Sequence, residues 1–433
     1  MKSKFTLYAI FLIWTTVLIV AFYHFLINSD NLKMIIYSNN NCFDSNRTQF
    51  FVTIDGIRYP KQVPLYENKS IDFKCLNSTN KPKTILLWTY FKGLPLPLVN
   101  YQTGLVKPFE SFNCPVTNCE LTYDRTKLIQ SDLVVFHLRN KINYLPTRSF
   151  PDQRFVHVIY ESPINCHLCT EYKNVFNLSA TYTLNSDYTS IYWSDAGIEW
   201  KENKSFDINY DFYSNKNKFA AAVISNCDDS SLRLSFIDEL RKYIDVDILG
   251  KCGSIPCDDI ICTRDYISKD YKFYLAFENS ICTDYITEKF FSYLKYNIIL
   301  VTLGGGNYSH YVPKSAYINA LDYKTPKDLA NYLIYLSNNK TAYNEYFKWK
   351  KYISFYDKNK IRNSGYLCEM CIQLHLEERL GYIKKKKLDD YNLDNLFGLE
   401  QNCKSSLFKQ VVRSLNKPKQ IDLIKHSYFM SQE

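Results

Sequence analysis

Residues 271–303 read YKFYLAFENSICTDYITEKFFSYLKYNIILVTL and are followed by three glycines at 304–306. The first seven residues are apolar or aromatic at nearly every position, which predicts a buried strand. After a polar turn, apolar residues recur at helical spacing from about Asp284 to Tyr296. Residues 298–303 are again continuously apolar. The segment therefore predicts a strand–helix–strand crossover between two parallel strands.

Similar short apolar segments recur along the chain, with helical patterns between several of them. Alternating strands and helices predict an α/β fold with parallel sheets. The polar stretch Lys201–Lys218 separates the earlier strands from the later ones, so we place a linker between two domains at 206–217. The predicted strands are Ile85–Trp88, Leu133–Phe136, Phe155–Tyr160, Ala220–Ile224, Val246–Leu249, Phe273–Phe277 and Ile298–Leu303.

The overall composition is that of a folded protein. The chain has 433 residues, of which 46% are hydrophobic and 22% charged, and these values exclude disordered and low-complexity classes. A net charge of +9 is spread over the chain, whereas nucleic-acid binding needs a denser basic face. We therefore expect no nucleic-acid partner, and the mild positive charge favours an anionic small substrate.

The amino-terminal residues predict a membrane anchor. Residues 5–27 are nearly all apolar or aromatic and are long enough to span a bilayer. Lys2 and Lys4 precede this run, so the positive-inside rule places residues 1–4 in the cytosol and the rest of the chain in the lumen. A cleaved signal peptide is the alternative, but the run is long for one and lacks a small-x-small cleavage site. We expect a single-pass type II anchor in the lipid bilayer, followed by a luminal stem at 28–82.

Sequons and cysteines also fit a secretory lumen. Fourteen cysteines, an even number, predict disulfides in an oxidising compartment. Two C-x-x-C pairs, at 166–169 and 368–371, could form a zinc site, but their wide separation favours disulfides. Seven N-x-S/T sequons are candidate glycosylation sites, namely Asn46, Asn68, Asn77, Asn177, Asn203, Asn307 and Asn339.

Polar residues and glycines follow several of the predicted strands. Ligands of open parallel sheets bind beyond the carboxyl ends of the strands. Helix amino termini near Arg233 and Tyr285 would direct N–H groups and partial positive charge at an anion. The glycines and these helix amino termini predict a diphosphate site. If the two sheets face each other, the cleft between them would be lined by the residues at the strand ends, which are His137, Arg139, Glu161, Ser225, Asn226, Glu278, Asn279 and the glycines at 304–306.

Residues 271–323 resemble the donor-binding signature of the α-1,3-fucosyltransferases of glycosyltransferase family 10, above all in FYLAFENS-x-C-x-DYITEKF. Weaker matches extend from about Thr84 to Cys371 and include the ESP motif at 161–163. The resemblance implies a GT-B fold, in which two Rossmann-like domains with parallel sheets face each other. The implied divisions are an acceptor-side domain at 83–205, a GDP-fucose-binding domain at 218–380 and a C-terminal extension at 381–433.

The resemblance also implies an activity, which is inverting transfer of L-fucose from GDP-β-L-fucose in α-1,3 linkage. The implied acceptor is a GlcNAc residue in a glycan of a glycoprotein or glycolipid. Such a displacement needs a base for the acceptor hydroxyl and cations for the departing diphosphate. The implied roles are Glu161 as the base, Arg233 and Lys289 as the diphosphate clamp, His137 on the acceptor side, and Ser225, Asn226, Glu278, Asn279, Tyr285 and Glu288 as further donor contacts.

Each assignment has a plainer alternative that the sequence leaves open. Glu161 could be a salt-bridged acid at a strand end, Arg233 and Lys289 surface cations, Tyr285 a packing residue and His137 a core histidine. The D-x-D at Asp245–Asp247 falls in a predicted strand and is interpreted as structural.

The chain departs from the family pattern at two positions. Asn140 stands where the family commonly has an acid, and the stretch from Asn297 lacks the usual Gly and Pro. No metal or other cofactor is required, because Arg and Lys can neutralise the diphosphate, which leaves room for stimulation by a divalent cation. The leading hypothesis is a fucosyltransferase of the Golgi membrane with a luminal catalytic domain. Its competitor is a catalytically inactive family member that acts as a luminal glycan-binding or scaffold protein.

Overall fold

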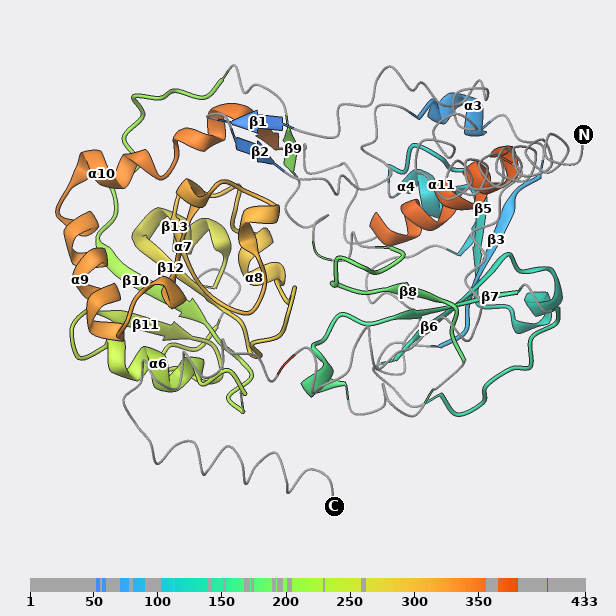
Figure 1. Cartoon of the computed structure of the whole chain (residues 1–433), viewed down its shortest axis with the longest axis horizontal. Helices are drawn as coiled ribbons and strands as arrows, with labels where there is room; N and C mark the ends of the chain where they lie inside the picture. Colours follow the sequence, from blue (N-terminus) through green and yellow to red (C-terminus); the bar gives the residue numbers. More distant parts are fainter. Residues whose placement is uncertain are drawn as a thin grey trace, which may run out of the picture.

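The computed structural model describes residues 71–355 and 365–380 with gaps, the longest at 90–102, together with two strands within 52–59 and Cys403. Most of these residues form two α/β lobes, each built on a mainly parallel sheet (Figure 1). The predicted α/β class with parallel sheets is confirmed. Strands β1 (Val52–Ile54) and β2 (Ile57–Tyr59) form a separate antiparallel pair.

The second lobe contains a five-stranded sheet with the order β11-β10-β12-β13-β14, in which all neighbours are parallel. In chain order this arrangement is 2-1-3-4-5, the doubly wound order of many nucleotide-binding folds. The strands are β10 (Lys218–Val223), β11 (Val246–Leu249), β12 (Tyr271–Phe277), β13 (Ile299–Leu303) and β14 (Tyr317–Asn319).

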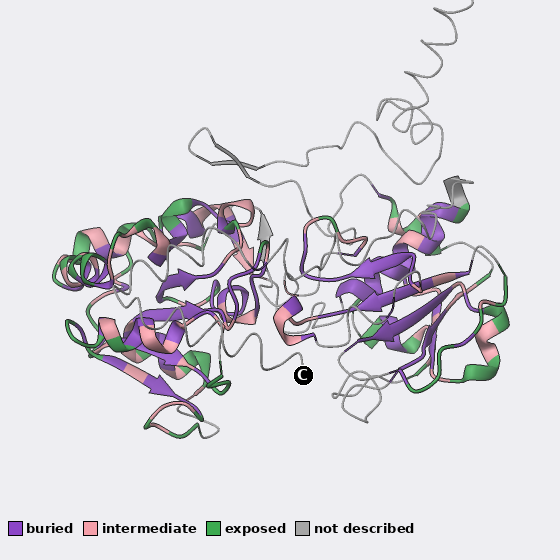
Figure 2. Cartoon of the chain, turned by 60° about the horizontal axis from the view of Figure 1, so that its bottom comes forward, coloured by how far each residue is buried: buried purple, intermediate pink, exposed green. Residues whose placement is uncertain are grey.

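Helices cover both faces of this sheet. Side chains alternate along a strand, so Ala220 and Ala222 face one hydrophobic cluster and Ala221 faces the other. Figure 2 shows the buried strands between partly exposed outer helices. The first cluster includes α6 (Arg233–Leu240), α9 (Pro326–Ser337) and α10 (Lys340–Glu345), and the second includes α7 (Arg264–Asp270) and α8 (Glu288–Phe291).

The first lobe contains a six-stranded sheet with the order β4-β5-β3-β6-β7-β8. Only the edge strand β4 is antiparallel, and without it the chain order is again 2-1-3-4-5. The sequence predicted three of these strands and missed β4, β5 and β8, which have two to four residues each. The strands are β3 (Lys83–Leu87), β4 (Gly104–Leu105), β5 (Cys119–Thr122), β6 (Leu133–His137), β7 (Arg154–Val158) and β8 (Leu178–Ala180).

The C-terminal helix α11 (Gly365–Leu380) belongs to the first lobe, although the sequence placed it in the second domain (Figure 1). Two disulfides join it to the neighbourhood of β5, namely Cys114–Cys368 and Cys119–Cys371. Glu377 pairs with Arg154 at the start of β7. Because the apolar face of α11 is buried against the first sheet, the predicted unit 218–380 is wrong at its C-terminal end.

Two predicted connecting segments also contribute to the cores. Ile71 and Leu76, within the predicted stem at 28–82, are buried in the same cluster as α11. Leu76 lies on the short helix α3 (Phe73–Asn77). In the predicted linker, Phe212 is buried and stacks on Phe347 with ring centroids 4.4 Å apart. Each lobe therefore begins earlier in the chain than the hydrophobic pattern predicted.

The crossover between β12 and β13 contains less helix than the pattern predicted. The expected helix over 284–296 shortens to α8, four residues long, with Thr287 as its N-cap. Asp284 has φ +60, a left-handed conformation that a helix does not tolerate. Ile286, Phe290 and Leu294 are nevertheless buried, so the apolar positions were correctly identified although the backbone was not.

No helix in the described part of the chain is long and apolar enough to cross a membrane. The predicted anchor at 5–27 lies outside the described residues, as do residues 1–4, most of the predicted stem and nearly all of 381–433.

Candidate active site

The strand order of the second sheet reverses between β10 and β12, and ligands of doubly wound sheets bind at the carboxyl edge of that point. The predicted pairs Ser225-Asn226 and Glu278-Asn279 follow these two strands. Arg233 bridges them, since its Nη1 donates to the carbonyl of Phe277 at 3.1 Å and its Nη2 donates to that of Asn226 at 2.8 Å. The structure therefore brings five predicted donor residues to one place.

Arg233 is almost fully buried, so the alternative of a surface cation is wrong for this residue. It begins helix α6, and its guanidinium joins the ends of two neighbouring strands. A buried charge is tolerated only where hydrogen bonds and nearby charges compensate for lost water. Its position at the reversal point makes Arg233 a suitable cation beside an anionic ligand.

A disulfide and a glycine hold the loop after β10. Ser225 and Asn226 are exposed, and Cys227 next to them is bonded to Cys252. Gly250 has φ +98, and a Cβ there would lie 2.8 Å from the carbonyl oxygen of Ile224. Only glycine fits this close approach, so the loop is fixed from the side of β11.

Two acids and one lysine surround the start of α8. The Glu278 carboxylate is fully buried and accepts from the Thr287 N–H at 2.8 Å and from the Thr287 hydroxyl. Lys289 Nζ lies 3.0 Å from Glu288 Oε1 and 3.7 Å from Glu278 Oε2. Glu278 therefore anchors the loop over 279–287, here called the donor loop, which carries Asn279 and Tyr285.

The charges of this group shift one another's pKa values. Burial raises the pKa of Glu278, against the effect of the Lys289 charge and the Thr287 hydrogen bonds. For Lys289, burial acts to lower the pKa, but Glu278 and Glu288 outweigh it and raise the pKa. Partial burial also disfavours ionisation of Glu288, yet Lys289 holds its pKa below the usual value. The positive charge of Arg233 acts on Lys289 as well, so both predicted clamp residues belong to one site.

The three glycines after β13 approach another loop of the protein closely. A Cβ on Gly305 would lie 2.2 Å from the Cys282 carbonyl oxygen, and one on Gly306 would lie 2.3 Å from the Ile286 side chain. The glycines thus permit tight packing of the 282–286 loop, whereas the sequence suggested an approach to a diphosphate.

Glu161 meets the donor loop where the two lobes touch. It follows β7 in the first lobe, and the Tyr285 hydroxyl from the second lobe donates to its Oε2 at 3.4 Å. Burial raises the pKa of Tyr285 well above its usual value, so the phenol remains a donor. Tyr182 packs edge-on against the Tyr285 ring with centroids 4.8 Å apart. The predicted base and a predicted donor residue are therefore neighbours.

His137 lies at the corresponding reversal point of the first sheet, between β3 and β6. It is the last residue of β6 and is buried, and its N–H donates to Thr89 Oγ1 at 2.6 Å. Its ring stacks on Tyr160, one residue before Glu161, with centroids 5.7 Å apart. The geometry fits either a core histidine or a residue that supports the segment carrying Glu161. Arg139 and Asn140 lie outside the described residues.

Tyr192 lies beside these groups and belongs to no motif in the sequence. Its hydroxyl donates to the carbonyl of Tyr160 at 2.7 Å, and its ring contacts hydrophobic clusters of both lobes. Burial raises its pKa, and the charges of Glu161, Glu278 and Glu288 add to this shift. Tyr192 thus lies close enough to three carboxylates of the candidate site for their charges to raise its pKa.

Comparisons with known proteins agree with these motifs. Residues 213–390 match the family described as "Glycosyltransferase family 10 (fucosyltransferase) C-term", and residues 80–193 match "Fucosyltransferase, N-terminal". The chain belongs to glycosyltransferase family 10.

Two curated relatives of this family 10 chain come from Drosophila melanogaster. Glycoprotein 3-alpha-L-fucosyltransferase A is 34% identical over 71% of this chain and 60% of the relative. Alpha-(1,3)-fucosyltransferase C is 30% identical over 68% of this chain and 73% of the relative. The chain therefore spans less than two thirds of the first relative. A solved alpha1,3-fucosyltransferase with GDP aligns at 16% identity and a TM-score of 0.45, over 73% of this chain and 94% of that one.

The described cysteines of this family 10 chain form disulfides, as predicted. No free cysteine occurs among the described residues, and both cysteines of the 368–371 pair are bonded to the first lobe. The Cys119–Cys371 disulfide also accounts for a cluster with His375 that has the composition of a metal site. Cys282 in the donor loop is bonded to Cys403, so the C-terminal extension is covalently attached beside the site.

The described sequons of this family 10 chain differ in accessibility. Asn77 and Asn307 are exposed and Asn339 is half-buried. Asn177 is buried, and its Oδ1 accepts from the Phe155 N–H at 2.8 Å, so the prediction of a glycan there is wrong for this fold. The remaining predicted sites, Asn46, Asn68 and Asn203, lie outside the described residues.

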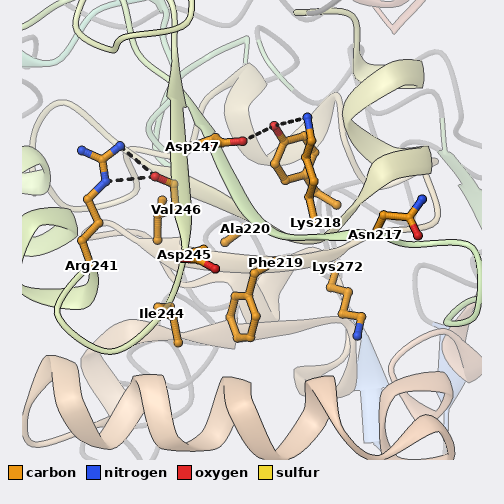
Figure 3. Close-up of a pocket in the computed structure, with 11 residues that line it drawn as sticks. Asn217, Lys218, Phe219, Ala220, Arg241, Ile244, Asp245, Val246, Asp247 and Lys272 are labelled. Atoms are coloured by element: carbon orange, nitrogen blue, oxygen red, sulfur yellow. Dashed lines mark hydrogen bonds between the residues drawn. The ribbon is translucent and has the colours of Figure 1, made fainter.

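A cavity of about 680 Å³ lies at the amino ends of β10, β11 and β12, the opposite edge from the candidate site (Figure 3). Its polar groups are largely paired with one another. The Tyr271 hydroxyl donates to Asp247 Oδ2 at 2.6 Å, and Arg241 donates to the carbonyl of Val246. This pairing supports a structural role for Asp247 of the D-x-D in this family 10 chain.

Proposed function

We propose that this chain is an inverting α-1,3-fucosyltransferase that uses GDP-β-L-fucose and modifies a GlcNAc residue of a glycan. The observation that carries the proposal is the contact between Glu161, after a strand of the first sheet, and Tyr285, in the donor loop of the second sheet. Residues that follow strands at the carboxyl edges of two doubly wound sheets thereby meet, which supports a GT-B arrangement.

In the proposed reaction Glu161 removes the proton of the acceptor hydroxyl. The acceptor oxygen forms a bond to the anomeric carbon of fucose while the bond from that carbon to the diphosphate breaks. The single displacement inverts the anomeric configuration. Arg233 and Lys289 stabilise the negative charge that GDP carries away, and this electrostatic stabilisation requires no metal ion. Asn279 and Glu288 are proposed to contact the sugar and nucleoside parts of the donor, with Ser225, Asn226, Glu278 and Tyr285 around them.

The proposed setting is the Golgi membrane, with residues 5–27 as a type II anchor and the catalytic lobes in the lumen. The fourteen cysteines support an oxidising compartment, since every described cysteine is disulfide-bonded. Glycosylation is proposed at Asn77, Asn307 and Asn339 among the described sequons.

The test is an assay of the membrane-bound full chain with GDP-fucose and defined glycans. The panel holds N-glycan cores, LacNAc antennae and LacdiNAc, and products are identified by mass spectrometry and linkage analysis. We expect fucose in α-1,3 linkage on GlcNAc. Absence of both transfer and donor hydrolysis in a protein that binds GDP and glycan would contradict the proposal and favour the scaffold alternative.

A further inference from the structure

A pair of buried hydroxyls joins the two lobes directly beside the candidate site. Ser162 belongs to the first lobe and Ser280 to the second, and both are fully buried. Their Oγ atoms lie 2.8 Å apart. Asn165 Nδ2 donates to both Oγ atoms at 3.3 Å, so the pair is held from a third side.

This hydroxyl pair is adjacent in sequence to two of the proposed site residues. Ser162 follows Glu161, and Ser280 follows Asn279 and contacts its Oδ1 at 3.2 Å. Ser230, three residues before Arg233, donates to the Asn279 carbonyl at 3.3 Å, and its hydroxyl lies 3.4 Å from Ser280 Oγ. One short polar network therefore runs from Ser162, next to the proposed base, to Asn279, a proposed contact of the GDP-fucose donor.

We propose that Ser162 and Ser280 are positioning residues that set the distance between Glu161 and the donor bound by the second lobe. The inference rests on the proposed function. A transfer step needs the acceptor oxygen, the base and the anomeric carbon within a few tenths of an ångström of their reactive geometry, and a misplacement of 1 Å can cost about a hundredfold in rate. The hydrogen bond between Ser162 and Ser280 joins the lobes one residue away from Glu161 and one residue away from Asn279. It therefore fixes this geometry more directly than contacts farther from the site.

Other contacts keep the lobes together when this bond is removed. The Leu184 N–H of the first lobe donates to Asp284 Oδ2 at 3.1 Å, and Tyr182 packs on Tyr285. Loss of one serine hydroxyl should therefore shift the junction without separating the lobes. The expected defect is in turnover, because the groups that bind GDP remain within the second lobe.

The first part of the test compares Ser162→Ala, Ser280→Ala and the double variant in the full chain. We expect kcat to fall about 10- to 100-fold in each single variant, with the GDP dissociation constant within about twofold of wild type. Because both serines act through one bond, the double variant should lose little more than either single variant. Ser179→Ala is the matched control, since Ser179 is equally buried but bonds to Asp187 within the first lobe.

The second part measures amide hydrogen exchange and needs no activity. Ser280→Ala should speed exchange in the first lobe around 161–166, and Ser162→Ala should speed it in the second lobe around 279–285. A serine with only a local structural role would not change exchange in the opposite lobe, and Ser179→Ala should not do so.

The outcomes separate this proposal from the proposed function. Unchanged exchange in the opposite lobe overturns the positioning role, as does an unchanged kcat in an active enzyme or an equal loss in Ser179→Ala. If wild type transfers no fucose but the reciprocal exchange effect is present, the proposed function fails while the serine contact between the lobes stands. If one single variant does not fold, the other tests the same bond from the opposite side.

Discussion

The two lobes share one strand order, but they are assembled from very different stretches of chain. The second sheet and most of the donor site come from residues 218–337, and a single segment carries Glu278 through Lys289. The core of the first lobe is completed by α11, whose disulfide partners lie 254 and 252 residues away in sequence. The second lobe is therefore built largely from one continuous stretch of sequence. The first lobe is complete only when α11, which follows the second lobe in sequence, packs back onto it. A truncation or mutation that removes α11, near the C-terminus, should therefore destabilise the first lobe.

The largest expected effect comes from removal of α11. Leu367, Met370, Ile372 and Leu374 are buried in the first core, and each contributes about 1.5–3 kcal/mol. Their combined loss matches the whole stability of a typical domain, about 5–15 kcal/mol. A chain ending at residue 364 should yield no folded first lobe, measured as protease resistance of residues 71–188.

The control for this truncation ends at residue 404, which keeps α11 and the Cys282–Cys403 disulfide. This longer chain should resist protease as the full chain does. Equal resistance of both truncated chains would contradict the dependence of the first lobe on α11.

In the second lobe, Lys289→Ala should weaken ligand binding more than it lowers the stability of the fold. The variant removes a cation from the diphosphate and leaves the buried Glu278 carboxylate without it. We expect GDP binding to weaken by about 1.5–3 kcal/mol, roughly 10- to 150-fold, measured by calorimetry. Lys269→Ala is the control, because Lys269 is exposed on α7. Unchanged GDP affinity in a folded Lys289 variant would remove this residue from the clamp.

The sequence predicted the second lobe better than the first for physical reasons. Long, continuously apolar strands such as β12 and β13 are recognisable alone, because burial on both faces excludes polar residues. Strands β5 and β8 have only four and three residues, too few for a clear period. The partners of α11 could not be predicted, since a cysteine's spacing does not show which distant cysteine it meets.

At the site, residue types were predictable but their contacts were not. The family resemblance marked Glu161, Arg233 and Lys289, and the structure places them at or beside the junction of the lobes. It did not indicate that Glu278 would hold Thr287, the N-cap of α8, so that the helix begins four residues later than expected. Contacts between lobes, such as that of Ser162 with Ser280, depend on docking that no local pattern encodes.

A smaller expected effect is a pH dependence of stability that comes from the buried Lys350 in the second lobe. Lys350 donates to the carbonyl of Tyr296 at 2.6 Å and to Asn297 Oδ1 at 3.3 Å, so Asn297, one of the family departures, has a structural partner. Burial, with the nearby Lys216 charge, lowers the pKa of Lys350 to about 7. The unfolded chain then binds more protons than the native one above pH 7, and stability rises with pH.

The expected gain is about 1 kcal/mol between pH 7 and pH 8, measured by denaturant unfolding. Lys350→Met should remove this gain, whereas Lys348→Met, at a half-exposed position, should retain it. A wild-type unfolding free energy that falls over this interval would contradict the assignment.

The central claim is that the first lobe supplies the base and the second lobe binds GDP. Glu161→Gln tests it most directly, with fucose transfer and GDP affinity measured on the same preparation. Glutamine keeps the size of the side chain and an acceptor for the Tyr285 hydroxyl, but it cannot take the acceptor proton. We predict a fall in transfer of about 10²–10⁴-fold with GDP affinity unchanged, because the base belongs to the first lobe and the GDP contacts to the second. Near-normal transfer, or a loss of GDP binding in proportion to the loss of transfer, would contradict this account.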